Sequence, residues 1–223
     1  RPCRGEGAGP AVKTCLFPPY RPQQAKLFGK EHIMSNPLVL METSSGDILL
    51  ELFEDRAPAT VANFLRYVDE DFYTNTIFHR VINDFMIQGG GLSVRMEEKA
   101  THEPIANEAG NGLQNLRGTI AMARTSEPHS ATAQFFINVE DNPELDHRDD
   151  SAEGFGYCVF GKVEDGMDVV DKIRKLKTKA QGEHEAVPLD MVEFFCAAME
   201  AVAGKYACHV LSFRSTGACC VIQ

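Results

Sequence analysis

The stretch FHRVINDFMIQGGG, residues 78–91, decides the fold of this chain. It contains two short apolar runs, within Thr76–Ile82 and Phe85–Gly89, on either side of a polar turn, which is the pattern of paired strands. A charged side chain, Arg80, interrupts the first run, and the amide of Gln88 lies near the end of the second. Three consecutive glycines then follow, which allow a sharp turn or a close approach of another group.

Strict alternation of side chains along each strand predicts which residues share a face. It places Phe78, Arg80 and Ile82 on one face of the first strand, and Met86 and Gln88 together on a face of the second. The pattern therefore predicts a guanidinium and an amide on an otherwise apolar surface.

The rest of the chain adds further short strands and two helices. The helix over 57–70 has apolar residues at helical spacing and Pro58 in its first turn, where a missing N–H costs nothing. The expected strands are Val39–Glu42, Asp47–Phe53, Thr76–Ile82, Phe85–Gly89, Thr119–Arg124, Gln134–Val139 and Gly156–Val163, and the second helix is Gly166–Leu176. Strands dominate, so we expect a mostly β protein, a closed antiparallel β-barrel plugged by the two helices.

The segment after about Val187 has two interpretations. It is either a last strand, or a helix in which Asp190 is the N-cap and Glu193 completes a capping box. The hydrophobic pattern favours neither of them.

Composition excludes several classes of protein. The net charge of −10 disfavours general binding to nucleic acid, and the basic run 172–179 is expected to be the solvated end of a helix. There is no apolar run of membrane-spanning length. Of seven cysteines only Cys158 lies well inside the regular part, which fits a reducing cytoplasm rather than a disulfide framework.

A second glutamine, Gln134 in AQFF, also lies within an apolar run that contains aromatic residues, as Gln88 does in the opening stretch. Arg80, Gln88 and Gln134 all lie among aromatic residues such as Phe85 and Phe136. An isolated polar residue of this kind is expected to pair with a carboxylate or a backbone group. Three together beside aromatic rings indicate an apolar groove with a few oriented donors, as in a ligand site.

Four blocks carry a resemblance to a known family. FHRVINDFMIQGGG, NLRGTIAMAR, SATAQFFINV and GYCVFGKVEDGMDVVDKI are closely similar, in order and spacing, to the cyclophilins, which are peptidyl-prolyl cis-trans isomerases. The similarity covers residues from about 36 to about 192, and the residues within these four blocks most resemble those of the bacterial cytoplasmic branch of the family.

The resemblance implies an eight-stranded antiparallel β-barrel capped by two α-helices, with the active groove on its outside. It also implies an isomerase of Xaa-Pro bonds that assists protein folding, with neither a cofactor nor a metal nor a covalent intermediate. The expected partners are proline-containing peptides and unfolded or folding proteins, the expected state is a monomer, and the expected location is the cytoplasm. The implied catalytic residues are Arg80 and Gln88, of which Gln88 holds the substrate backbone. The implied substrate-binding residues are Phe85, Met86, Phe136, Leu145 and Tyr157 around the proline, Ala123 and Arg124 along the substrate backbone, and Gln134 as support for the groove.

The chain departs from the family at the rim of the groove. Many cyclophilins have a tryptophan where this chain has Glu144, and a histidine where it has Tyr157. The missing tryptophan also contacts cyclosporin, so we expect weak binding of this drug. The loop 146–156 is longer and more acidic than in short members of the family.

The ends of the chain do not match the family. We expect residues 1–33 to be a disordered extension or an artefact, 34–192 to be the isomerase domain, and 193–223 to be a non-matching tail. The final CVIQ fits a prenylation pattern with Cys220 as acceptor, although four residues match easily by chance.

Two other functions compete with the isomerase. The histidines suggest a metal site or a hydrolase, but they lack ligand spacing, and His79 is expected to be a core residue. A non-catalytic module that binds proline peptides on the same barrel would keep the apolar pocket and lose the arginine. The presence of Arg80, Gln88 and Phe136 favours the enzyme.

Overall fold

The computed structural model describes residues 36–182 and 184–200. Its elements, in chain order, are β1 (Leu38–Thr43), β2 (Gly46–Leu52), α1 (Pro58–Asp69), β3 (Thr76–Ile82), β4 (Met86–Ser93), β5 (Thr119–Met122), β6 (Phe135–Asn138), β7 (Val159–Asp165), α2 (Met167–Arg174), β8 (Thr178–Gln181), β9 (His184–Pro188) and β10 (Phe194–Glu200), with short 3-10 turns at Ala109–Asn111 (η1) and Pro143–Leu145 (η2). The strands and helices expected from hydrophobic periodicity are all present, with ends shifted by a few residues.

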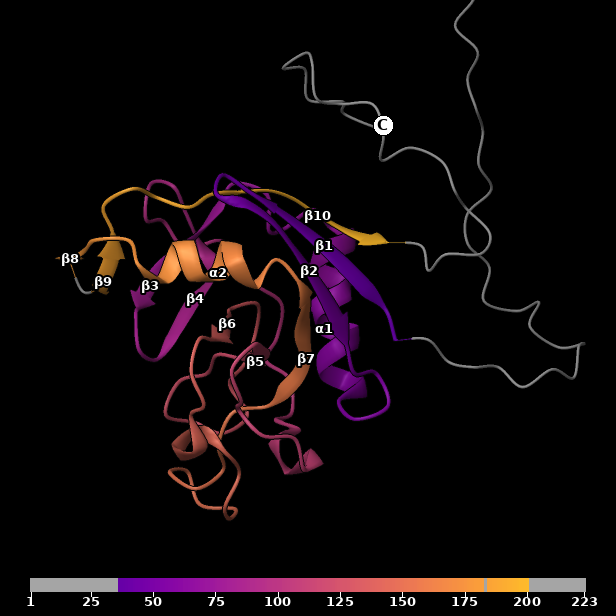
Figure 1. The fold of residues 1–223 in the computed structure, drawn as a ribbon. Coiled ribbons are helices and arrows are strands. Elements are labelled where there is room, and N and C mark those ends of the chain that lie inside the picture. Colours follow the sequence, from indigo (N-terminus) through magenta and orange to yellow (C-terminus); the bar gives the residue numbers. More distant parts are fainter. Residues whose placement is uncertain (1–35, 183, 201–223) are drawn as a thin grey trace, which may run out of the picture. The chain divides into compact units, whose positions relative to one another are not determined.

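Eight of the strands form one antiparallel sheet that curls into a nearly closed barrel (Figure 1). The hydrogen-bonded order is β10-β1-β2-β7-β5-β6-β4-β3. The two ends of this order are joined by a bridge between Ile77 and Glu193 and by the Phe78 amide, which donates to the Val192 carbonyl at 3.0 Å. The predicted fold class is confirmed.

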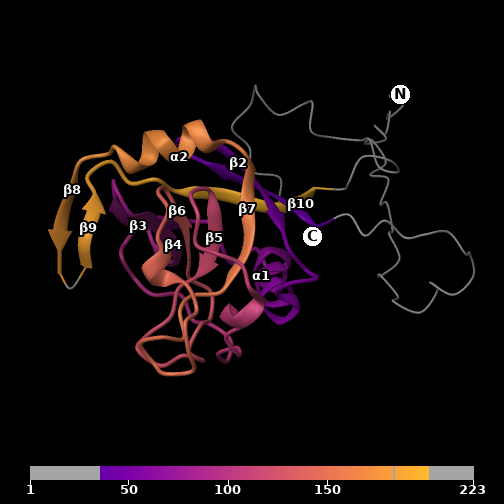
Figure 2. The ribbon, with the colours of Figure 1, turned by 60° about the horizontal axis from the view of Figure 1, so that its bottom comes forward.

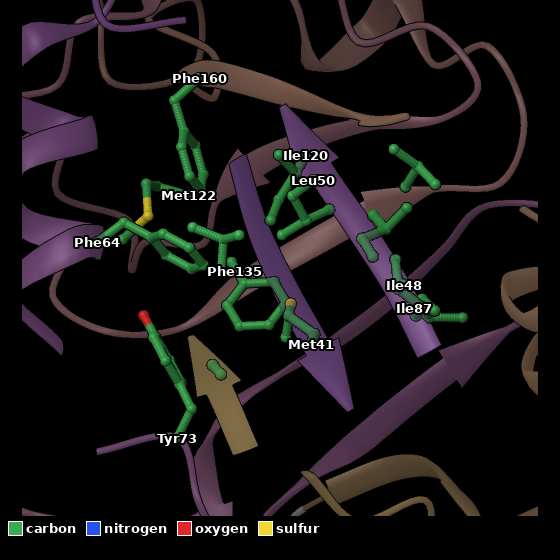
Figure 3. Packing of buried hydrophobic residues seen from close by; sticks show 14 of the residues in the cluster. Met41, Ile48, Leu50, Phe64, Tyr73, Ile87, Ile120, Met122, Phe135 and Phe160 are labelled. Carbon is green, nitrogen blue, oxygen red and sulfur yellow. The ribbon is translucent and has the colours of Figure 1, made fainter. Parts of the chain in front are cut away.

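The two helices bury their apolar faces on the barrel from different sides (Figures 1 and 2). From α1, Phe64 lies 5.7 Å from Phe135 and 5.2 Å from Phe160, measured between ring centroids. Figure 3 shows these rings packed together with Met122 and Leu50 from the surrounding strands. Burial of this interior, at roughly 25 cal/mol per Å² of apolar surface, is the main force that holds the barrel together.

The segment after Val187 forms a strand rather than a helix. β10 pairs along the whole of β1, from Leu38 opposite Glu200 to Thr43 opposite Phe194. Pairing with the edge of β1 therefore decides between two interpretations that the local pattern left open. The predictions for 1–33 and for the CVIQ terminus lie outside the described residues.

The β8–β9 hairpin was not predicted from the sequence. β9 lies along β3 at the edge of the barrel (Figure 2). In the described part of the chain, no helix is long and apolar enough to cross a membrane.

A bulge in β3 corrects the predicted side-chain alternation. Phe78 is opposite Gly89 and Arg80 is opposite Gln88, so two steps along β3 match one step along β4. Phe78 is consequently buried in the barrel interior, whereas Arg80 points to the outside. The prediction that these two residues share a face was wrong, because a β-bulge shifts the phase of the strand.

Candidate active site

A pocket of about 270 Å³ lies on the outer surface of the barrel, over β3, β4, β5 and β6. Its lining residues are Arg80, Phe85, Met86, Gln88, Ala123, Arg124, Phe136, Leu145 and Tyr157. We refer to it as the first pocket. The structure thus brings together all the predicted site residues except Gln134, which lies directly behind Gln88.

The floor of the first pocket is apolar and separate from the barrel interior. Met86 and Phe136 are buried there against Ala121 and Val159. The Tyr157 ring meets the Phe136 ring edge-on, with centroids 5.6 Å apart. Such a surface binds a compact apolar group through the hydrophobic effect and offers rings on two sides.

Phe85 also belongs to this floor, although alternation placed it on the opposite face from Met86. It precedes β4 and lies in the turn, where the strand period does not yet apply. The Asn142 side chain holds this turn by donating to the Phe85 carbonyl at 2.9 Å.

Arg80 supplies the charge at the edge of the floor. Its side chain is half-buried, and within residues 36–182 and 184–200 it makes no hydrogen bond or ion pair. The expectation for an isolated arginine, a carboxylate partner at the sheet edge, is not met in this part of the chain. A guanidinium that lacks a partner retains its five N–H donors for a ligand.

Gln88 and Gln134 form a fixed pair beside this arginine. The Gln88 amide donates from Nε2 to Oε1 of Gln134 at 3.0 Å. The backbone carbonyl of Gln134 in turn accepts a hydrogen bond from the backbone amide of Ala123 at 2.9 Å, which ties the start of β6 to the end of β5. The orientation of Gln88 is therefore set by its neighbours before any ligand arrives.

The three glycines of the opening stretch make room for this arrangement. A Cβ added to Gly91 would lie 2.4 Å from Cγ of Gln134, so the glutamine occupies the space of the missing side chain. Gly90 has a φ of +81°, which L side chains rarely adopt, and a Cβ there would meet the Phe135 ring at 2.6 Å. The glycines thus serve close packing rather than a turn alone.

Arg124 braces the other wall of the first pocket. Its guanidinium lies over the Tyr157 ring, 4.7 Å from the centroid. It also donates to the carbonyls of Gly156 at 2.9 Å and Ala152 at 3.0 Å, in the acidic loop. The Arg124 side chain is therefore engaged within the protein, in contrast to Arg80.

The rim of the first pocket carries Glu144, in η2, with its side chain exposed. The neighbouring Leu145 is half-buried, and its carbonyl accepts from the Tyr157 amide at 2.9 Å. Glu144 itself is not among the residues that line the pocket.

A second pocket, also about 270 Å³, adjoins the first. His79, Arg80, Gln88, Gln134, His184 and Glu185 line it. Arg80 and Gln88 line both pockets, so the two pockets are neighbours that share these side chains. Sequence analysis missed the contribution of β9; the one available signal was Gly182, which sits at a turn with a φ of +61°.

His79 is the buried histidine of this region. Only 4% of its surface is exposed, and its Nδ1 has no hydrogen-bond partner. Burial, and then the proximity of His184, lower the pKa of His79 to about 4, so that the ring is neutral at neutral pH. No group of three or more His, Cys, Asp or Glu side chains in the described part could hold a metal ion.

A curled antiparallel barrel with an external apolar pocket, an unpaired arginine and a fixed glutamine defines a class of peptide-binding isomerase. Comparisons with known proteins agree with this assignment. The family model for the cyclophilin type peptidyl-prolyl cis-trans isomerase/CLD matches residues 38–193. The chain belongs to this family.

Individual relatives show how close the similarity is. Peptidyl-prolyl cis-trans isomerase B of Escherichia coli is 61% identical over 155 residues, which cover 70% of this chain and 94% of that protein. A peptidyl-prolyl cis-trans isomerase of Streptomyces antibioticus is 56% identical over 154 residues, or 69% of this chain and 93% of that protein. A crystal structure of a Cryptosporidium parvum cyclophilin, determined in the presence of the dipeptide Ala-Pro, is 27% identical with a TM-score of 0.60, and the match covers 74% of this chain and 99% of that one.

Proposed function

We propose that this protein accelerates the cis/trans isomerisation of Xaa-Pro bonds in the first pocket, with Arg80 as the catalytic group. The observation that carries the proposal is the contrast between the two arginines of that pocket. Arg124 is bound to backbone carbonyls, whereas Arg80 has no partner in the described part of the chain. A half-buried cation without a partner, next to an apolar floor, is poised for a ligand.

The chemical task is to lower the barrier to rotation about an amide bond. Resonance between the carbonyl and the nitrogen makes this barrier about 18–20 kcal/mol. In the twisted transition state that resonance is lost, and the proline nitrogen gains a lone pair that can accept a hydrogen bond. A guanidinium that donates to this lone pair binds the twisted state more tightly than either planar isomer, which is the condition for catalysis.

Arginine suits this role better than lysine. Its guanidinium is planar, remains charged at any physiological pH, and keeps its donors in a fixed direction. The bulge in β3 that turns Arg80 out of the barrel interior is thus the structural feature on which the proposed chemistry depends.

The remaining residues hold the two sides of the bond. The floor of the first pocket, with Met86 and Phe136 at its base, takes the prolyl ring. Gln88, fixed by Gln134, binds the substrate backbone, and the backbone at Ala123 and Arg124 lies along the same wall. One side of the peptide bond is then fixed while the other rotates, without a cofactor or a covalent intermediate.

The natural partners follow from this site. We propose proline-containing segments of unfolded or folding proteins as substrates, a monomer as the working form, and the cytoplasm as its place of action.

The decisive experiment follows the exchange of a short Xaa-Pro peptide by NMR, with the wild-type chain and with Arg80→Ala. We expect acceleration by the wild type and a loss of at least about tenfold in the variant, while peptide binding persists. Arg66→Ala, which removes an exposed arginine on α1, is the matched control. If the folded wild type binds peptides but does not accelerate exchange, the protein is a binding module and the catalytic proposal is wrong.

A further inference from the structure

The second pocket has the character of a binding site in its own right. It is a concave space of about 270 Å³. All six of its lining residues have polar or charged side chains, and all of them except the exposed Glu185 are buried or half-buried. Its most buried member, His79, has a ring nitrogen without a hydrogen-bond partner.

We infer that the second pocket binds an uncharged hydrogen-bonding side chain of the substrate, such as Thr, Ser, Asn or Gln, at a position close to the Xaa-Pro bond. The inference rests on the proposed function, because it assigns a substrate preference to the same groove. Adjacency is the first support for it: Arg80 and Gln88 line both pockets, so the second pocket lies within reach of a residue next to a proline seated in the first.

The kind of side chain follows from what the pocket offers. The His79 ring is neutral because burial disfavours its charge. Its Nδ1 is enclosed by the protein, and its Nε2 makes no hydrogen bond within the described residues, so Nε2 is the nitrogen that the ring can offer to a ligand. Gln134 uses its oxygen to accept from Gln88, and its amide N–H groups make no hydrogen bond within the described part of the chain. A hydroxyl or a carboxamide can satisfy both groups, whereas an apolar side chain leaves both unpaired.

Charge argues against an acidic or a basic side chain. The formal charges at this pocket are the guanidinium of Arg80 and the carboxylate of Glu185, one of each sign. In the proposed chemistry Arg80 donates to the proline nitrogen, so this cation is not available to pair with a substrate carboxylate. A substrate lysine would have to approach the same guanidinium, and the neutral His79 offers it no compensation.

β9 is the part of the fold that makes this pocket. His184, half-buried on β9, faces His79 with ring centroids 5.9 Å apart and closes the pocket on the side away from the barrel. Because β8 and β9 form a hairpin outside the eight-stranded sheet, replacing His184 removes no hydrogen bond of the barrel strands.

The test uses pairs of peptides that differ only in hydrogen-bonding capacity. Thr and Val have nearly the same shape, so each is placed in turn at the positions on either side of the Xaa-Pro unit, and kcat/KM is measured by NMR exchange. We expect one position at which Thr exceeds Val by about fivefold, the worth of a single hydrogen bond. Asp and Lys at that position should fall below Thr.

Variants then assign the preference to the pocket. In His79→Phe and in His184→Ala, we expect the ratio of kcat/KM for the Thr peptide to kcat/KM for the Val peptide to fall towards one. Because both values in each ratio come from the same variant, a change in the overall activity of that variant cancels. Lys179→Ala, an exposed substitution on the same hairpin, should keep the wild-type ratio. If His79→Phe does not fold, the 15N shift of the His79 ring in the wild type replaces it, and this signal should move with the Thr peptide more than with the Val peptide.

The outcomes separate the two proposals. Equal rates for Thr and Val at every position, in a chain that accelerates exchange, would overturn the inference and leave the isomerase intact. A preference for Asp or Lys would show an ionic pocket and would overturn it as well. If no peptide is accelerated, the proposed function fails and the inference fails with it.

Discussion

Arg80 is directly opposite Gln88 in the register of β3 and β4, and both side chains line the first and the second pocket. The two residues differ in how they are held. Gln88 is anchored by its hydrogen bond to Gln134, whereas Arg80 has no partner within the described residues. The groove thus combines a preorganised anchor with a cation that is free for a ligand, and the predictions below probe both parts.

Gly91→Ala should weaken substrate binding without touching the catalytic arginine. The new Cβ would lie 2.4 Å from Cγ of Gln134 and would force this side chain out of its position. Gln88 would then lose its partner, so we expect KM to rise about fivefold, with a smaller effect on kcat. Gly110→Ala is the control, because a Cβ there meets nothing closer than 3.8 Å. Unchanged kinetics in Gly91→Ala would mean that the glutamine pair does not hold the substrate.

Arg124→Ala tests whether the first pocket depends on the brace behind Tyr157. The substitution removes the cation over the Tyr157 ring and the bonds to Gly156 and Ala152. We expect faster hydrogen exchange in the loop 146–156 and a KM raised by about three- to tenfold, while kcat changes little.

Arg124→Lys separates the two roles of this brace. A lysine keeps the charge near the ring, but it lacks the planar fork that reaches several carbonyls at once. We therefore expect it to restore only part of the wild-type KM. A complete restoration would show that the cation over Tyr157, and not the loop contacts, sets the pocket.

Glu144→Trp should raise the affinity for cyclosporin. Glu144 is exposed at the rim next to Leu145, and its carboxylate cannot cover an apolar ligand. A tryptophan adds a large ring and an N–H donor at this place. We expect weak binding by the wild type and a gain of about tenfold or more in the variant, measured by isothermal titration calorimetry. Glu144→Gln, which removes only the charge, is the control, and a sub-micromolar dissociation constant for the wild type would contradict the prediction.

Much of this architecture could be predicted from the sequence, because short apolar runs and turn residues reveal strands and their order. The first pocket was predictable through the family resemblance, which named the residues that now line it. Three features were not. The bulge in β3 changes the phase of a strand without any local signal at Phe78 or Arg80. In the hairpin, β8 is exposed along most of its length and β9 is buried only at its end, so neither strand shows an apolar alternation.

The third feature is the strand β10. Its residues, FFCAAME, suit a helix as well as a strand, and the choice depends on pairing with β1, a contact between the two ends of the domain. Such tertiary decisions are invisible to a window of local sequence.

The buried His79 should make the stability of the protein depend on pH. Its pKa in the folded chain is about 4, and in the unfolded chain it returns to about 6.5. Between these values the unfolded state binds the proton and the folded state does not, so the free energy of unfolding falls as the pH falls from about 6.5 towards 4. The difference corresponds to about 3 kcal/mol at most.

The measurement is urea unfolding from about pH 7 to about pH 4.5, for the wild type and for His79→Asn. Carboxylates contribute in the same direction; the pKa of Glu51, for example, is lowered by a hydrogen bond from Asn36 and by Lys162. They are common to both proteins and cancel in the difference, so the wild type should lose more stability on acidification than the variant. If His79→Asn proves too unstable to measure, NMR titration of the His79 ring in the wild type decides, because a midpoint near 6.5 would show that burial does not hold this ring neutral.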